Sequence, residues 1–158
     1  MKTKMKFNRS SLFLGILLAL TVFAAVPGYA RSTTGFNSFH ILGKQGTVPS
    51  YSCIWEDYAA AVNGCSPLSL AFDLPVDSTG WKGIDVVDYA NGYGSFNCQA
   101  ITFSPTGRVD YYGTSATFNP AGQETLHFDT YIWTGDSMTI YCWDVPTGRG
   151  ITSLNWAP

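Results

Sequence analysis

Two stretches of the chain, 124–132 and 138–145, bring aromatic rings together with hydrogen-bonding side chains at every second position. The five side chains concerned are His127, Asp129, Tyr131, Tyr141 and Trp143. The apolar C–H face of a pyranose stacks on an aromatic ring, while its hydroxyls need hydrogen-bonding partners. We therefore interpret these side chains as a candidate glycan-binding surface, on the condition that the two stretches are neighbouring strands.

A hairpin between the two stretches would satisfy this condition. If Cys142 and Phe128 both point into the core, the loop between the stretches must have an odd number of residues, and a loop over 133–137 has five. The cross-strand pairs predicted in this register are Phe128 with Cys142 inside, and His127 with Trp143 and Asp129 with Tyr141 outside. The hairpin thus predicts one continuous outer patch.

Catalytic chemistry finds less support. A serine or cysteine nucleophile needs a nearby base, and the chain has only two histidines and no Gly-x-Ser-x-Gly elbow. The aspartates at 73, 77, 85 and 88 do not match calcium-loop spacing. We therefore predict no catalytic residue, no metal site and no cofactor, and keep a small secreted hydrolase as the third hypothesis, since a carboxylate pair would be set by the fold.

Four cysteines, an even number without a Cys-x-x-Cys pair, predict disulfides rather than zinc. Three connectivities exist. We favour Cys53 with Cys65, which bracket one local excursion, and Cys98 with Cys142, which join two strand-like segments. This pairing is a preference and not a deduction.

The loop over 53–65, between the first two cysteines, offers an alternative contact surface. Its side chains are Trp55, Glu56, Asp57 and Tyr58. A loop held by a disulfide is a natural contact for another protein, so a structural or protein-binding module, such as an inhibitor, is the second functional hypothesis. Whether 56–62 is a helix or a strand stays open at this point.

The rest of the chain is typical of an all-β domain. Glycines and aromatic residues are abundant and turn signals recur about every ten residues. In the segment 68–74, leucine and phenylalanine alternate with Ser69, Ala71 and Asp73, and Pro75 ends the strand. Further strands are predicted at 82–89, 95–103, 108–112, 124–132, 138–145 and 151–156. We predict one small antiparallel β-sandwich with seven to eight strands and two disulfides.

The N-terminal segment 1–30 has the layout of a secretory signal. Basic residues precede an apolar run over 12–25, and Gly28 and Ala30 are small residues at the positions read by a signal peptidase. The run is shorter than the roughly twenty residues of a membrane-spanning helix. We predict cleavage near Ala30 and a secreted or periplasmic protein with no stable membrane span in the mature chain.

The predicted mature part has room for one domain. We assign 31–49 to a leader or first edge strand, with a strand over 36–41, and 50–158 to the sandwich. This part carries five basic and eleven acidic residues, a formal charge of 5 − 11 = −6. Nucleic-acid binding requires the opposite sign, so we predict no nucleic-acid partner.

Short segments resemble a group of small, uncharacterised secreted bacterial proteins. These segments are 84–88, Asn97-Cys98, 142–146 and 151–156. The resemblance implies a β-sandwich-like domain with a late cysteine pair and no known activity. Those proteins often have Cys-Pro where this chain reads Leu74-Pro75, so their first disulfide does not carry over.

Together these observations predict a secreted, non-catalytic interaction protein, with glycan or cell-surface binding as the concrete form. The identity of the ligand and the oligomeric state do not follow from the sequence.

Overall fold

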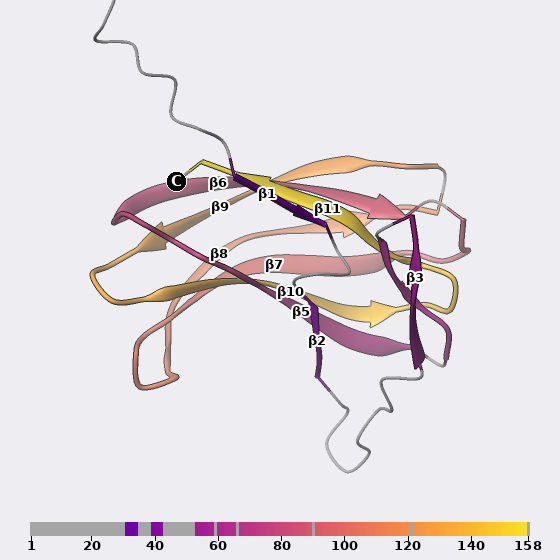
Figure 1. Cartoon of the computed structure of the whole chain (residues 1–158), viewed down its shortest axis with the longest axis horizontal. Coiled ribbons are helices and arrows are strands. Elements are labelled where there is room, and N and C mark those ends of the chain that lie inside the picture. The colour runs from indigo at the N-terminus through magenta and orange to yellow at the C-terminus, as the bar shows by residue number, and fades with distance from the viewer. Residues whose placement is uncertain are drawn as a thin grey trace, which may run out of the picture.

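The computed structural model describes residues 31–34, 39–42, 53–58, 60–65, 67–89, 91–120 and 122–157, with the backbone alone at 34 and 39–42. These residues form no α-helix and eleven strands in two antiparallel sheets that face each other (Figure 1). The predicted all-β sandwich is confirmed, although it has more strands than the seven to eight expected. The predicted signal segment 1–30 lies outside the described residues.

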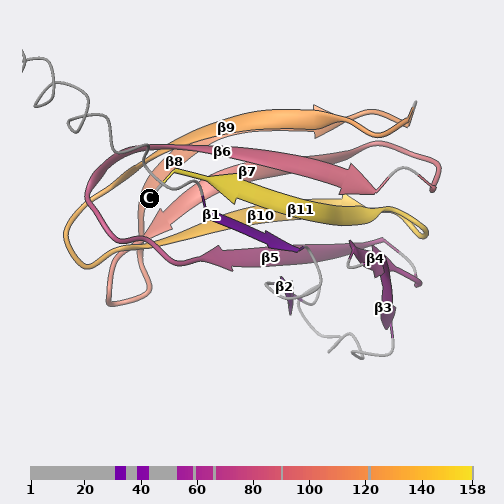
Figure 2. The same cartoon turned by 45° about the horizontal axis from the view of Figure 1, so that its top comes forward.

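The first sheet has the order β3-β4-β11-β6-β9, and β1 pairs with β11 beyond the end of β4. Figure 2 shows β9, β6 and β11 side by side in this order. The strands are β1 (Arg31–Thr34), β3 (Ile54–Asp57), β4 (Ala60–Asn63), β6 (Gly80–Tyr89), β9 (Thr125–Ile132) and β11 (Gly150–Trp156).

The second sheet has the order β2-β5-β10-β7-β8. Its strands are β2 (Phe39–Leu42), β5 (Leu68–Leu74), β7 (Phe96–Phe103), β8 (Val109–Phe118) and β10 (Ser137–Val145). The alternating segment 68–74 is thus a strand as predicted. The strand expected over 36–41 is β2 at Phe39–Leu42, and the strand expected over 108–112 extends to Phe118.

The two sheets meet along one edge, where β8 crosses close to β9. A side chain at Gly113 would put its Cβ 2.1 Å from the carbonyl oxygen of Asp129, so only glycine allows the two backbones to approach this closely. The register of β8 on β7 shifts between Gln99 and Ile101, which is a bulge at this point. The backbone N–H of Asp129 donates to Oγ1 of Thr114, 2.7 Å away.

The core is formed by the inward residues of both sheets. Phe96 of β7 stacks on Phe118 of β8 with 4.9 Å between ring centroids, and Phe118 lies 6.4 Å from Phe128 of β9 in the other sheet. All three rings are fully buried. Apolar residues at alternate positions of β5, β6, β9 and β10 complete the core, which is the packing that a half-buried strand pattern predicts.

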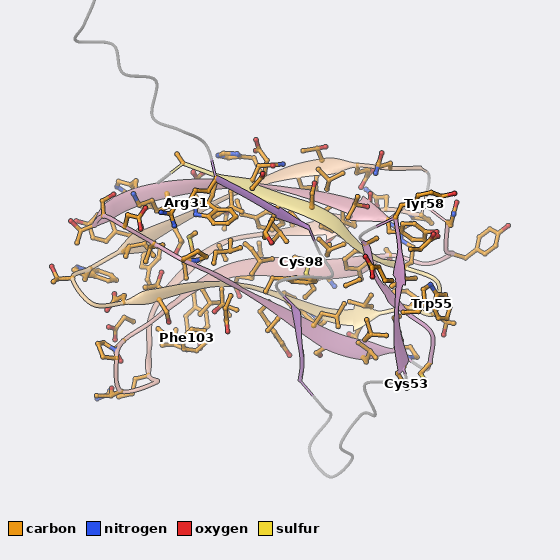
Figure 3. All side chains as sticks on the ribbon, in the orientation of Figure 1. Arg31, Cys53, Trp55, Tyr58, Cys98 and Phe103 are labelled. Carbon is orange, nitrogen blue, oxygen red and sulfur yellow. A yellow bond between two sulfur atoms is a disulfide. The ribbon has the colours of Figure 1, made fainter. Side chains whose placement is uncertain are left out.

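Both predicted disulfides are present. Cys53 bonds to Cys65, and Cys98 bonds to Cys142. Cys98 and Cys142 are direct cross-strand partners on β7 and β10, and their bond lies between the layers (Figure 3). The predicted connectivity is therefore confirmed, and among the described residues no cysteine is free.

The predicted hairpin between 124–132 and 138–145 is wrong. Strand β9 pairs with β6, and β10 pairs with β5 and β7, so the two strands belong to different sheets. The connection over 133–136 crosses from one sheet to the other, with Trp133 and Asp136 hydrogen-bonded within it. Phe128 and Cys142 do point into the core as predicted, because alternation fixes the inward face but not the neighbour.

The segment 56–62 belongs to two strands and not to a helix. Strands β3 and β4 form a hairpin in which Asp57 pairs with Ala60, so the chain turns after Asp57, at Tyr58, rather than at Asn63-Gly64. Tyr58 adopts a positive φ of 48° in this turn. The Cys53–Cys65 disulfide joins the two ends of the hairpin.

One ion pair is buried inside the sandwich. Asp88 of β6 and Arg149 are both fully buried, and Nη2 of Arg149 donates to the Asp88 carboxylate and to the carbonyl oxygen of Asn119. The N–H of Glu124 donates to the other Asp88 oxygen at 2.6 Å. Burial raises the pKa of Asp88, while the Glu124 N–H and Arg149 act in the opposite direction.

No membrane-spanning helix occurs among the described ranges.

Candidate functional site

The five side chains predicted to form one patch lie on the outer faces of two different sheets. His127, Asp129 and Tyr131 point outward from β9, opposite Asp85, Gly83 and Trp81 of β6. Tyr141 and Trp143 point outward from the middle strand of the other sheet. The single patch is therefore corrected to two surfaces separated by the core.

The imidazole of His127 lies between two carboxylates. Its Nδ1 is 2.6 Å from Oδ1 of Asp85, and its Nε2 is 3.3 Å from Oδ1 of Asp129. All three side chains are about half exposed. A Cβ at Gly83 would lie 2.7 Å from Cε1 of His127, so the glycine within β6 leaves the space that the ring occupies.

The two carboxylates change how His127 titrates. The hydrogen bond with Asp85 raises the pKa of His127 above its usual value, the charges of Asp129 and Asp85 raise it further, and partial burial opposes them. Protonated His127 is therefore the form that this surface stabilises. Its contribution to folding is complete below about pH 6.5, the unfolded value, and is lost as the pH rises through the raised folded value.

We expect an NMR titration to show His127 with a pKa above about 6.5. Asp85→Asn should lower this pKa more than Asp129→Asn does, because the Asp85 oxygen is closer to the ring. A His127 resonance that titrates at or below the usual value in the unaltered protein would contradict the geometry described here.

Aromatic rings gather at the end of β9 beside Asp85, His127 and Asp129, which we call the triad. Trp81 of β6 meets Tyr111 of β8 at 5.9 Å and Tyr131 of β9 at 5.5 Å between centroids, in both cases edge to face. Trp133 follows β9 and lies 4.8 Å from Tyr131 and 6.1 Å from Tyr111. Trp81 remains 65% exposed and Tyr112, next to Tyr111, 63% exposed.

An open hollow of about 550 Å³ lies in this region. We call it the aromatic pocket. Its lining residues are Trp81, Tyr111, Tyr112, Gly113, Thr114 and Asp129. Tyr111 and Tyr112 pair with the consecutive residues Thr102 and Ile101 of β7, and the bulge at 113–114 follows them along β8. Both tyrosines line the hollow together with Gly113 and Thr114. The pocket therefore combines three rings with a hydroxyl and a carboxylate.

Most of the pocket was not predicted from the sequence. Asp129 was among the predicted residues and lines the pocket, and His127 and Tyr131 adjoin it through Asp129 and Trp81. Trp81, Tyr111, Tyr112 and Thr114 were missed. Trp81, Gly83 and Asp85 alternate with the buried Ile84 and Val86, and this alternation would have placed the first three on one outer face. The alternation does not predict that β6 pairs with β9.

Tyr141 and Trp143 form a separate feature on the second sheet. Their rings stack at 5.7 Å with an interplanar angle of 23°, and the Tyr141 hydroxyl donates to Oγ of Ser69 at 3.2 Å. Both side chains are half-buried. The lining of the aromatic pocket includes neither ring.

The alternative contact residues lie at the opposite end of the sandwich. Trp55 and Tyr58 of the β3–β4 hairpin stand at one end of the long axis, while Phe103 lies toward the other (Figure 3). The aromatic pocket belongs to the Phe103 end, because Tyr111 pairs with Thr102 next to it. Glu56 is exposed and Asp57 accepts a hydrogen bond from the Tyr89 hydroxyl. In the described part of the chain, no three His, Cys, Asp or Glu side chains group as a metal site.

Comparisons with known proteins show the fold and no sequence family. No protein-family model matches the chain, and no curated protein matches it by sequence. The carbohydrate-binding module "BiXyn10A CBM1" in its apo form superposes with a TM-score of 0.54 at 10% identity, over 81% of this chain and 96% of that module. "CBM35 from Cellvibrio japonicus Abf62" gives 0.52 at 17% identity, over 82% and 94%.

A third structure contains a catalytic domain as well. A structure of the CBM22-1–GH10 modules of Clostridium thermocellum endo-1,4-β-D-xylanase 10B is matched with a TM-score of 0.51 and 12% identity, over 82% of this chain and 28% of that chain. At these identities the match concerns the fold. This chain is therefore similar in fold to carbohydrate-binding modules, and the β-sandwich implied by the sequence resemblance is confirmed.

Proposed function

We propose that this protein is a non-catalytic glycan-binding module that holds a sugar ring in the aromatic pocket. The observation that carries the proposal is the composition of this pocket, which Trp81, Tyr111 and Tyr112 line together with Asp129 and Thr114. Aromatic faces stack on the C–H face of a sugar, and the carboxylate and hydroxyl are partners for its hydroxyls. The three predicted residues of β9, His127, Asp129 and Tyr131, belong to this proposal.

The size and openness of the pocket support binding of a short stretch of glycan. Its volume of about 550 Å³ lies in the range of roughly 300–1,000 Å³ that is usual for small-molecule sites. The exposed Trp81 ring and the triad around His127 extend from the pocket along the outer face. A chain of sugars lying across β6 and β9 would contact both.

The arrangement does not favour glycoside hydrolysis. Hydrolysis uses two carboxyl groups that flank the scissile bond, about 5–9.5 Å apart, whereas the lining of the pocket contributes one, Asp129. The fold likeness to carbohydrate-binding modules supports the same conclusion. It gives no support to the alternative in which the β3–β4 hairpin binds a protein partner.

A location outside the cytoplasm fits this function. Disulfides persist in oxidising compartments, and both cysteine pairs of this chain are bonded. We propose a secreted or periplasmic protein, with cleavage of the signal near Ala30.

We expect Trp81→Ala to weaken glycan binding at least about tenfold, because central aromatic contacts dominate such interfaces. The measurement is a glycan array with the purified protein, followed by calorimetric titration of the strongest ligand. The matched control is Trp143→Ala, which removes the same ring from the outer face of the other sheet. Binding that survives Trp81→Ala and fails in Trp143→Ala would contradict the proposed pocket.

A further inference from the structure

The charges around the aromatic pocket are predominantly negative. Its lining contributes one carboxylate, Asp129, and no lysine or arginine. Lys82 follows Trp81 on β6 but points into the sandwich, is 4% exposed, and donates to Oγ of Ser78 at 2.6 Å. A ligand in the pocket therefore meets no basic side chain from the lining.

The histidine beside the pocket does not cancel this charge. His127 is closer to Asp85 than to Asp129, at 2.6 Å against 3.3 Å. With a protonated imidazole the three side chains carry one positive and two negative charges, a sum of −1, and with a neutral imidazole the sum is −2. The triad is thus negative in both states.

One Asp129 oxygen is available to a ligand. Oδ1 faces Nε2 of His127, whereas Oδ2 makes no hydrogen bond or ion pair with the described residues. The Asp129 side chain is half exposed, and its backbone is held by Thr114 through the 2.7 Å hydrogen bond to its N–H. The carboxylate is therefore fixed at the pocket while part of it remains open.

Aromatic rings next to a carboxylate are suited to a cation. A ligand ammonium group is attracted to the faces of tryptophan and tyrosine rings, and a hydrogen bond from an ammonium to a carboxylate is roughly twice as strong as a neutral one. Trp81, Tyr111 and Tyr112 supply the rings and Asp129 the carboxylate within one hollow. A carboxylate on the ligand would instead be repelled.

We propose that the aromatic pocket selects sugars that carry a free, protonated amine, such as 2-amino-2-deoxyhexose units, over neutral and acidic sugars. This inference rests on the glycan-binding function proposed above. The amine hydrogen-bonds to Asp129 and the sugar ring stacks on an aromatic face. Acetylation removes the charge of the amine, so the charged hydrogen bond to Asp129 is lost while the stacking of the sugar ring remains.

The test compares three oligosaccharides of equal length by calorimetric titration. It is done at about pH 6, so that His127 is protonated and its positive charge is part of the site. The probes are a glucosamine oligomer, its fully N-acetylated counterpart and a uronic-acid oligomer. We expect the glucosamine oligomer to bind at least about tenfold more tightly than the N-acetylated one, and the uronic-acid oligomer most weakly. Added salt should reduce the difference.

Asp129→Asn separates recognition in the pocket from general attraction of a cationic chain to an acidic protein. This variant should abolish the preference for the free amine, so that the glucosamine oligomer and its N-acetylated counterpart bind with equal affinity. The control is Asp144→Asn, which removes one exposed negative charge from β10 in the other sheet, at a positive φ of 57° that asparagine tolerates. This control should keep the preference.

The possible failures are distinguishable. Equal affinity for the first two oligomers, tighter binding of the uronic-acid oligomer, or a preference that survives Asp129→Asn would overturn the amine inference and leave glycan binding intact. If none of the oligomers binds and the glycan array is also blank, the proposed function fails and this inference with it.

Discussion

Arg149→Met is expected to lower the free energy of unfolding by about 3–5 kcal/mol, which is the usual cost of removing one partner from a buried ion pair. Arg149 is fully buried, and its guanidinium lies 5.4 Å from the Phe96 ring centroid and bonds to Asp88. Methionine fills much of the same space but leaves the Asp88 carboxylate without a counter-ion. The loss is measured as a change in the urea-unfolding free energy.

The Asp88–Arg149 ion pair also has an unfavourable contribution, from buried donors of Arg149 that are not hydrogen-bonded. Nε and Nη1 of Arg149 are buried and have no hydrogen-bond partner among the described residues, and an unpaired buried donor costs about 1–3 kcal/mol. The double variant Arg149→Met with Asp88→Leu should therefore be more stable than Arg149→Met alone, because it removes the isolated charge. If Arg149→Met costs less than about 1 kcal/mol, the ion pair does not contribute as described.

Replacing both Cys98 and Cys142 by alanine is expected to cost about 4 kcal/mol. The estimate follows from the entropy of closing a loop with a sequence separation of 44 in the unfolded chain. The bond also joins the two inner strands β7 and β10, and both cysteines belong to the same buried core as Phe96, Phe118 and Phe128. Chemical unfolding of the oxidised protein and the double variant measures the difference.

The second disulfide provides the matched comparison. Cys53 and Cys65 are 12 residues apart, so the same relation gives about 3 kcal/mol for their replacement by alanine. This bond joins the two ends of the β3–β4 hairpin at the edge of a sheet, whereas the Cys98–Cys142 bond links two inner strands. A larger loss on removal of Cys53 and Cys65 than of Cys98 and Cys142 would contradict this ranking.

The same connectivity that stabilises the sandwich also positions the pocket. The Trp81 strand, the Tyr111 strand and the Asp129 strand are β6, β8 and β9, which belong to two sheets. They come together because β8 bends toward β9 at Gly113. The pocket is therefore a property of the closed edge of the sandwich and not of one strand or loop.

Sequence reasoning predicted the parts of this protein that depend on local pattern. Alternation identified the strand over 68–74, and the inward faces inferred for Phe128 of β9 and Cys142 of β10 are correct. The disulfide pairing was also correct, since one pair brackets a short excursion and the other joins two strands. The strands and their inward faces follow from neighbours along the chain and from the period of two of a strand. The cysteine pairing was a preference among three connectivities.

Sequence reasoning failed where the neighbour in space mattered. His127 and Trp143 were correctly placed on outward faces, but they were assigned to one surface because a hairpin over 133–137 satisfies the alternation. A connection that crosses between the sheets can have the same odd number of residues, and it keeps the same residues inside. Alternation therefore does not distinguish a hairpin from a crossing.

What the sequence by itself determined is the all-β class and the inward and outward faces of the main strands, whereas for the two disulfides it supported a preference among three connectivities. Which outward side chains share a surface was decided only by the tertiary structure. Trp81 and Asp129 are far apart in the chain and meet because β6 pairs with β9, and Tyr111 joins them because β8 approaches β9 at Gly113. The reason is physical: burial selects a face of each strand, whereas the pairing of strands depends on how the whole set packs around one core.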